Sequence, residues 1–298
     1  MGRVPVPRRH NAGMSDPVID SGAAGIAPAV HLYQIAYSPA TLAAVQPGFL
    51  ALDNVANPRP DWYEYEPIRR FLLERPLDEQ AFYGFFSPKF TAKTLLDAAA
   101  ARAIVLQAAA SGADVVLFSP QPDMGAFFLN VFEQGEACDA GLIDAYEAFL
   151  AHIGRPLALR SLTMDARHVV FSNYFVARPA FWREWLALNE ALWAVCEGPP
   201  TPLQQALTQP TTYPGQAQRK VFLQERAASL LLTIQRDRWK THAANPFAMA
   251  WSSWRLREHP MEAVMSDALK LASSLSGAAG PYREAYGALR NQLFPPAA

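Results

Sequence analysis

The sequence carries little charge and no excess of either sign. Only 18% of its 298 residues are charged, and the formal net charge is -1. A protein that binds nucleic acid in general needs a strongly basic face that displaces counterions from the phosphates. The composition therefore argues against a nucleic-acid partner.

Cysteines and long hydrophobic runs are also scarce. Cys138 and Cys196 are far apart and have no metal-ligand or redox spacing, which predicts two free thiols in a reducing compartment. No window approaches the ~18 uncharged apolar residues of a membrane span. We expect a cytoplasmic protein without a transmembrane segment, and peripheral contact with the inner face of the membrane stays open.

Several well-known catalytic motifs are missing. The sequence has no Gly-rich phosphate loop, no G-x-S-x-G elbow, no H-E-x-x-H and no kinase signature, and its six histidines are scattered. These absences argue against the most easily recognised hydrolases, dehydrogenases and nucleoside triphosphatases.

Three apolar runs end at Ser-Pro: HLYQIAYSP (31–39), YGFFSPKF (83–90) and ADVVLFSPQPD (113–123). The residue before a proline favours extended backbone, while Ser and Pro suit the start of a helix. Each Ser-Pro therefore predicts a strand followed by a helix. Repeated in this order, such junctions predict an α/β fold with a mostly parallel sheet flanked by helices, whose ligands bind beyond the carboxyl ends of the strands.

We expect four regions along the chain. A flexible leader covers 1–29, an α/β domain 30–197, a Pro-rich loop or linker 198–218 and a helical region 219–298. Beyond the Ser-Pro junctions, strands are expected near 157–162 and 168–177, and helices over 91–110, 124–134, 142–153 and 178–197. The segment 198–218 holds five prolines and is expected to form no regular element.

Polar residues predicted at the strand ends are the candidates for chemistry. Asp123 follows a buried strand and could bind a divalent cation or cap the next helix. Asn173 interrupts a later strand and could contact a ligand or an internal network. Ser119 and Gln121 lie beside Asp123 in sequence.

A second cluster lies in LDNVANPRPDWYEYEPIRR (52–70), where charged and amide residues alternate with aromatics. Aromatic faces stack on bases or sugars, and Arg pairs with phosphate. The alternative is an aromatic helix start that packs on the sheet. The candidates for nucleotide or phosphate contact are Asp53, Asn54, Asn57, Arg59, Arg69 and Arg70.

A further candidate is the stretch 236–257, which is basic and rich in Trp. It could sit at an anionic lipid surface, or it could consist of solvated helix ends.

These segments, together with FFLNVFEQGE (127–136) and SNYFVARPAFWREW (172–185), resemble a group of bacterial glycosyltransferase-like proteins of capsule and O-antigen loci. They are also similar to capsular-polysaccharide transferases of the GT-A type. The resemblance implies a nucleotide-sugar-binding α/β domain over 30–197 that transfers a sugar to a glycan or lipid-linked glycan. The alternative is a non-catalytic glycan-binding or assembly protein with the same fold. A hydrolase is a third and less favoured hypothesis.

The resemblance also implies roles for single residues. GT-A enzymes bind Mg or Mn and the donor diphosphate through D-x-D, and the matching place here reads Gln121-Pro122-Asp123. Asp123 is thus the only carboxylate carried over, for donor or metal contact. Arg59, Arg69, Arg70 or Lys89 could hold the diphosphate instead, and Glu133 or Glu136 is the expected base.

Overall fold

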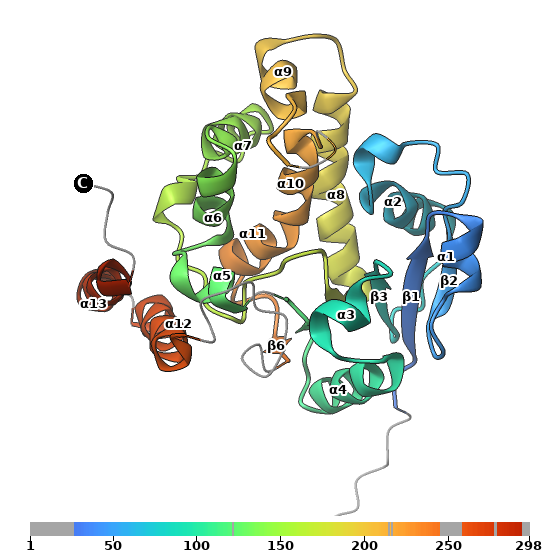
Figure 1. Ribbon diagram of the computed structural model, residues 1–298, viewed down its shortest axis with the longest axis horizontal. Coiled ribbons are helices and arrows are strands. Elements are labelled where there is room, and N and C mark those ends of the chain that lie inside the picture. The colour runs from blue at the N-terminus through green and yellow to red at the C-terminus, as the bar shows by residue number, and fades with distance from the viewer. Residues whose placement is uncertain are drawn as a thin grey trace, which may run out of the picture.

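The computed structural model describes residues 27–120, 122–213, 215, 217–244, 258–276 and 279–293, with the side chains of 122, 123 and 279 excepted. Residues 1–26 of the predicted leader and residues 245–257 of the basic stretch lie outside this part. Figure 1 shows helices packed on both sides of a central sheet. No helix within these ranges is long and apolar enough to cross a membrane.

The sheet has six strands in the order β2-β1-β3-β5-β4-β6. The strands are β1 (Val30–Ala36), β2 (Leu50–Asp53), β3 (Phe82–Phe86), β4 (Val115–Leu117), β5 (Phe175–Ala177) and β6 (Thr241–Ala243). β5 is antiparallel to both of its neighbours, and the other pairs are parallel. The carboxyl ends of all strands but β5 therefore lie at one edge of the sheet, together with the amino end of β5.

Alternate residues of the central strands enter two hydrophobic cores, one on each face of the sheet. Phe82 and Val116 pack with helix α4 (Ala98–Ala110) on one face. Phe85 and Phe175 pack on the other face with α8 (Pro179–Cys196) and α2 (Tyr65–Glu74). The centre of the sheet admits only glycine at Gly84, since a Cβ there would lie 2.6 Å from Val176 Cγ2.

The remaining helices lie on both faces of the sheet and in the carboxyl-terminal region, and Phe90, for example, packs in the core of the first face. They are α1 (Pro39–Ala43), α3 (Phe90–Thr94), α5 (Pro122–Phe127), α6 (Val131–Cys138), α7 (Leu142–His152), α9 (Pro202–Thr208), α10 (Arg219–Glu225), α11 (Ala227–Ile234), α12 (Pro260–Leu275) and α13 (Ala279–Leu293). Short 3-10 turns cover Pro60–Trp62 and Leu159–Ser161. The predicted α/β class, the strands that precede the Ser-Pro junctions, α7 and α8 are confirmed.

Two of the predicted helices are each divided into two. The helix expected over 91–110 breaks at Leu95, whose φ is 58°, and restarts behind the Asp97 N-cap as α4. The helix expected over 124–134 consists of α5 and α6, because the Asn130 side chain caps a new helix by accepting hydrogen bonds from the Phe132 and Glu133 amides, both at 2.9 Å.

Two strand predictions fail for local reasons. The strand expected near 157–162 is wrong, since the Asn130 Nδ2 group donates to the carbonyls of Leu159 and Leu162 at 3.0 and 2.8 Å, around a 3-10 turn. The strand expected over 168–177 is limited to β5. Ser172 and Asn173 have φ values of 60° and 53°, which are incompatible with extended backbone.

The segment 198–218 and the carboxyl-terminal region also depart from expectation. The Pro-rich segment contains helix α9, because Pro202 lies in its first turn and the Thr201 Oγ1 accepts from the Gln204 amide at 3.1 Å. The described part of the region 219–298 is mostly helical as predicted, and it also supplies β6, which pairs with β4. A strand of this length has no periodicity to reveal it.

Candidate functional site

The carboxyl edge of the sheet collects polar side chains from segments far apart in sequence. Ser87 follows β3, Ser119 follows β4, and Tyr174 immediately precedes the antiparallel β5. The Ser87 and Tyr174 hydroxyls lie 2.6 Å apart, and Ser119 Oγ accepts from the Phe171 amide at 3.0 Å. This edge is where the sequence predicted a binding site.

The loop before β5 holds two consecutive residues in the left-handed region. Ser172 and Asn173 both have positive φ, and strain of this kind at non-glycine residues concentrates at functional sites. The Ser172 Oγ accepts from Lys93 Nζ at 2.9 Å, and Asn173 Nδ2 donates to the Gln224 Oε1 at 3.3 Å. Within the described part of the chain, Asn173 Oδ1 is buried and has no hydrogen-bond partner.

Two carboxylates and an ammonium group meet behind this loop. Burial and, to a smaller extent, the nearby Glu64 raise the pKa of Glu225 to about 7, against the effects of Arg226 and Lys93. Burial also raises the pKa of Glu64, against the effect of Lys93 and Lys89. Burial lowers the pKa of Lys93, although both glutamates counteract this.

The hydroxyl of Tyr37 belongs to the same cluster. Tyr37 directly follows β1, and burial together with the negative charge of Glu64 raises its pKa. The cluster thus links the end of β1, the segment before α2, helix α3 and helix α10. Burial is the largest cause of the pKa shift of each of these groups, and pKa values displaced in this way are typical of catalytic sites.

A cleft of about 440 Å³ opens beside this cluster. Glu225, Lys93 and Ser172 line it, and so does Met124 at the start of α5. The segment between α9 and α10 contributes another wall. The remaining lining residues include Gln134, Gly135, Cys138, Phe171, Thr211, Thr212, Tyr213, Phe222 and Arg226.

The predicted cluster in 52–70 is divided between two places. Asp53, Asn54 and Arg70 line a separate hollow of about 470 Å³ at the end of β2. There the Arg70 guanidinium donates to the Asp53 carbonyl at 3.2 Å and to Asn54 Oδ1 at 3.3 Å. Asn57 has a φ of 34° and accepts from Asn54 Nδ2 at 3.2 Å.

The other two arginines of the cluster bind α8 and its end. Arg59 pairs with Asp61 at 2.9 Å and Glu197 at 2.6 Å. Arg69 forms a two-pronged pair with Glu190 at 2.5 and 2.8 Å. Both guanidinium groups also lie over the Trp193 ring, so the packing alternative describes this half of the cluster.

The two expected bases stabilise local structure. Glu133 accepts from the Leu129 amide at 2.6 Å and pairs with Arg290 at 2.6 Å. Glu136 accepts from the amides of Gly141 and Ile143, at 2.9 and 2.8 Å, at the start of α7. Neither carboxylate lines the cleft beside Glu225.

Asp123 lies within the first turn of α5 and not before the helix, so the N-cap interpretation is wrong. Its neighbour Met124 lines the cleft, which places the Asp123 backbone at the rim. The Asp123 side chain and Gln121 lie outside the described residues. Lys89 is exposed, and its positive charge reaches Glu64.

The side chains that the structure describes include no group of three or more His, Cys, Asp and Glu residues able to hold a metal ion. Asp123, the one residue predicted to contact Mg or Mn, is not covered by this finding, because its side chain lies outside the described part. Among the described residues, the positively charged side chains that line the cleft are Lys93 and Arg226.

The sequence analysis assigned no role to three residues of the cluster beside the cleft: Glu64, Lys93 and Glu225. Glu64 lies within the second cluster, at 52–70. Lys93 lies in the helix after the second Ser-Pro junction, and this position could have identified it as a candidate for the site. Glu225 joins from a distant helix that no motif marks. Comparisons with protein-family models, with curated proteins and with solved structures gave no significant match.

Proposed function

We propose that this chain is a glycosyltransferase that takes a nucleotide-sugar donor and acts in the synthesis of bacterial surface polysaccharide or glycoconjugate. The observation that carries the proposal is Glu225, a carboxylate with a pKa raised to about 7 that lines a cleft at the carboxyl edge of a mostly parallel sheet. The sequence resemblance supplies the substrate class, and a GT-A type fold is part of the same proposal.

Glycosyl transfer needs a base for the acceptor hydroxyl. A group whose pKa is near the working pH combines a sizeable basic fraction with useful proton affinity. Glu225 meets this condition. We assign to its carboxylate the role of accepting the proton of the acceptor hydroxyl, while the hydroxyl oxygen forms a bond to the anomeric carbon of the donor. Glu64 helps to keep the proton affinity of Glu225 high.

The departing nucleoside diphosphate must be stabilised as the anomeric carbon–oxygen bond breaks. Lys93 is the residue for this role, because its ammonium group lines the same cleft and is held by the Ser172 hydroxyl at 2.9 Å. Asp123 remains our proposal for a further donor contact, since its backbone lies at the cleft rim.

Thermal denaturation in the presence of UDP- and GDP-sugars tests donor binding. A ligand that binds only the folded protein stabilises it by about 2.7 kcal/mol at a hundredfold excess over its dissociation constant. We expect a saturable rise in melting temperature with at least one donor, and release of its nucleoside diphosphate when an acceptor glycan is added. Absence of any shift across the panel, with and without Mg or Mn, would contradict the proposal.

A matched pair of variants localises the donor. Lys93→Met should raise at least tenfold the donor concentration that gives half of the maximal rise in melting temperature. Arg183→Met is the control, because Arg183 is exposed and pairs with Glu79 on the surface at 2.7 Å. Donor binding without any transfer would favour the non-catalytic alternative.

A further inference from the structure

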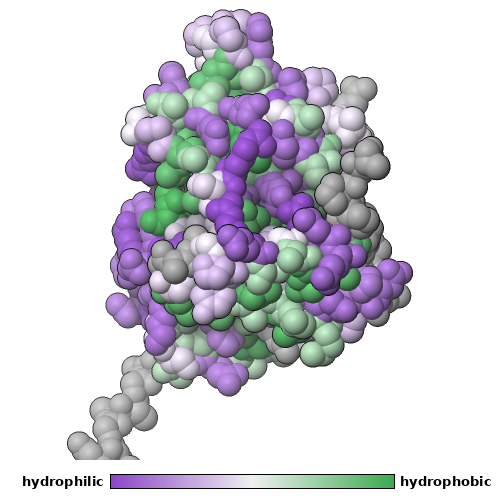
Figure 2. All heavy atoms as spheres, turned by 90° about the vertical axis from the view of Figure 1, so that its left-hand side faces the viewer, coloured by the Kyte–Doolittle hydropathy of each residue, from purple (hydrophilic) through white to green (hydrophobic). Residues whose placement is uncertain are grey.

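Helix α12 exposes its hydrophobic face and buries polar residues, the reverse of an ordinary surface helix. Met261, Met265 and Leu275 are 66%, 51% and 70% exposed. Lys270 and Ser266, on the opposite side of the helix, are 1% and 0% exposed. Figure 2 views the molecule from the side on which α12 and α13 lie, and hydrophobic residues are visible among hydrophilic ones in the lower half of this face.

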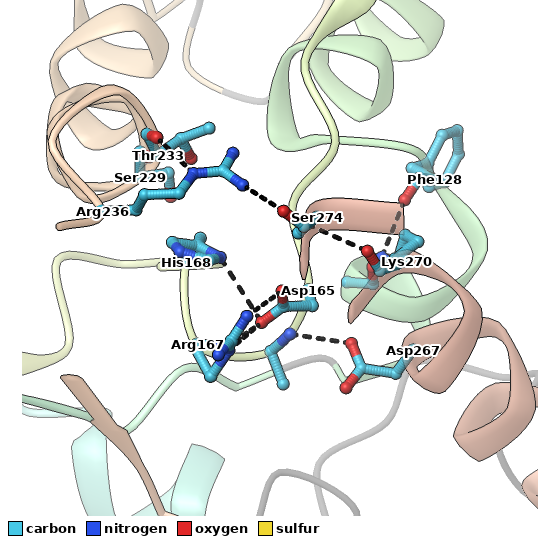
Figure 3. Close-up of polar contacts among 12 residues, drawn as sticks. Phe128, Asp165, Arg167, His168, Ser229, Thr233, Arg236, Asp267, Lys270 and Ser274 are labelled. Atoms are coloured by element: carbon cyan, nitrogen blue, oxygen red, sulfur yellow. Dashed lines mark hydrogen bonds and ion pairs between the residues drawn. The ribbon is translucent and has the colours of Figure 1, made fainter. Parts of the chain in front are cut away.

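Specific hydrogen bonds fix this orientation. Lys270 Nζ donates to the carbonyls of Gly125 and Phe128 in and after α5, and the Asp267 carboxylate accepts from the Ala166 amide at 2.7 Å (Figure 3). Turning the hydrophobic face inward would break all three bonds and leave a buried ammonium without partners. The exposed stripe is therefore a stable feature of the fold.

The stripe has the spacing of a helix–helix seam. Its residues are Met261, Met265, Ala268, Ala272 and Leu275, separated by four, three, four and three positions. This alternation keeps side chains on the line along which two helices pack, as in a coiled coil. The small residues at the centre allow two backbones to approach closely.

The two ends of the stripe carry opposite charge. Glu258 is exposed before α12, and Glu262 lies in its first turn. At the other end Leu275 shares a hollow of about 440 Å³ with four basic residues and two acidic ones, so that its lining has a net positive charge: Arg167, Arg236, Arg238, Lys240, Asp114 and Asp237. The Arg236 guanidinium donates to the Ser274 carbonyl at 3.1 Å (Figure 3), which ties this basic hollow to the end of the helix.

We propose that a second copy of this chain covers the stripe, with the two α12 helices antiparallel about a two-fold axis at Ala268. In this arrangement Met261 lies opposite Leu275 of the other copy, and Met265 lies one position out of register with Ala272, the stripe residue nearest to it, so that a large residue packs beside a small one near the axis. The acidic end of each helix faces the basic hollow of its mate. An anionic lipid surface would attract one end of the stripe and repel the other. This inference does not depend on the proposed activity.

Sedimentation velocity over a range of concentrations tests the association. We expect a reversible dimer whose dissociation constant rises at least tenfold in Met265→Glu. Leu73→Glu is the control, because Leu73 is an exposed apolar residue of α2, 53% exposed, and lies away from α12. A protein that stays monomeric at every concentration overturns the proposal, as does equal weakening by both variants.

Cross-linking tests the direction of the pair, in a Cys138→Ser background that removes the exposed native thiol. Combined Met261→Cys and Leu275→Cys should form intermolecular disulfides on oxidation, and neither substitution alone should do so. Cross-linking by the single variants indicates parallel helices and overturns the antiparallel arrangement. Flotation of the monomer with phosphatidylglycerol vesicles, abolished by Met265→Glu, would assign the stripe to a membrane and overturn the second copy.

Discussion

Two charged regions of this protein look alike in composition and differ in how their charges are balanced. The region between α2 and α8 contains Arg69 and Lys220, each with a carboxylate at 2.5–2.6 Å. The cluster beside the cleft contains Glu64, Glu225 and Lys93, and burial shifts the pKa of all three groups so that the neutral form is favoured. Ion pairs that favour the charged form stabilise a fold, whereas groups whose pKa is displaced by burial are typical of catalytic sites.

The largest expected effect is on catalysis in the cleft. Replacing a general base lowers turnover by about 10²–10⁴-fold. Glu225→Gln should reduce kcat by at least 100-fold with little change in donor affinity, measured as release of nucleoside diphosphate from the donor that the thermal screen identifies. Glu79→Gln, on the exposed surface, should leave kcat unchanged. A fully active Glu225→Gln variant would remove the base assigned here.

The next effect concerns stability in the paired region. The Lys220 ammonium is buried, lies 2.6 Å from Asp61 and 3.6 Å from Glu197, and sits over the Trp62 ring. Lys220→Met leaves Arg59 as the one described cation paired with these carboxylates, and we expect a loss of about 2 kcal/mol in the free energy of unfolding. Urea denaturation measures this loss. An unchanged midpoint would show that the pairing in this region contributes nothing.

The pH dependence of stability separates the two regions further. The raised pKa of Glu225 means that the folded protein retains a proton which the unfolded chain loses as the pH rises from about 4.5 to 7. This group therefore lowers stability as the pH rises through that window, by roughly 1–3 kcal/mol. Glu225→Gln should lose less stability than the wild type between pH 4.5 and 8, measured by urea denaturation at each pH. Parallel curves for the two proteins would contradict the raised pKa.

The smallest effect is expected at Arg69. Arg69→Lys keeps the positive charge but loses the two-pronged pair with Glu190 and the stacking on Trp193. We expect a loss of about 1 kcal/mol in the free energy of unfolding, because the pair is partly exposed. Donor affinity, measured by the ligand-induced melting shift, should not change. If Arg69→Lys reduced the donor-induced melting shift without any loss of stability, Arg69 would be assigned to the ligand site.

Local sequence signals identified the framework of this protein well. The Ser-Pro junctions located β1, β3 and β4, because the residue before proline must leave helical geometry. The capping interpretation is confirmed at the first junction only, where the Ser38 side chain accepts from the Thr41 amide at 3.2 Å. Helix α3 has Lys89 at its N-cap, and α5 begins at Pro122, so Ser87 and Ser119 cap neither helix. The edge of the sheet that carries the cleft also followed from these junctions.

The site itself was only partly predictable. The aromatic and charged residues of 52–70 attracted attention, but sequence could not reveal that Arg59 and Arg69 find their partners on α8, more than a hundred residues later. The same limit applies to Glu133 and Glu136, whose carboxylates accept hydrogen bonds from nearby backbone amides. A carboxylate looks the same in sequence whether it caps a helix or faces a cleft.

The sequence by itself determined the α/β class and the strands that end at Ser-Pro, because these depend on contacts within a few residues, and it predicts the edge of the sheet as the place where ligands bind. Only the tertiary structure decided where ion pairs favour the charged form of a group and where burial favours the neutral form. It brings Glu64, Lys93 and Glu225 together from segments far apart in the chain, and burial changes the proton affinity of all three. Burial and pairing are properties of the packed molecule, and no local pattern encodes them.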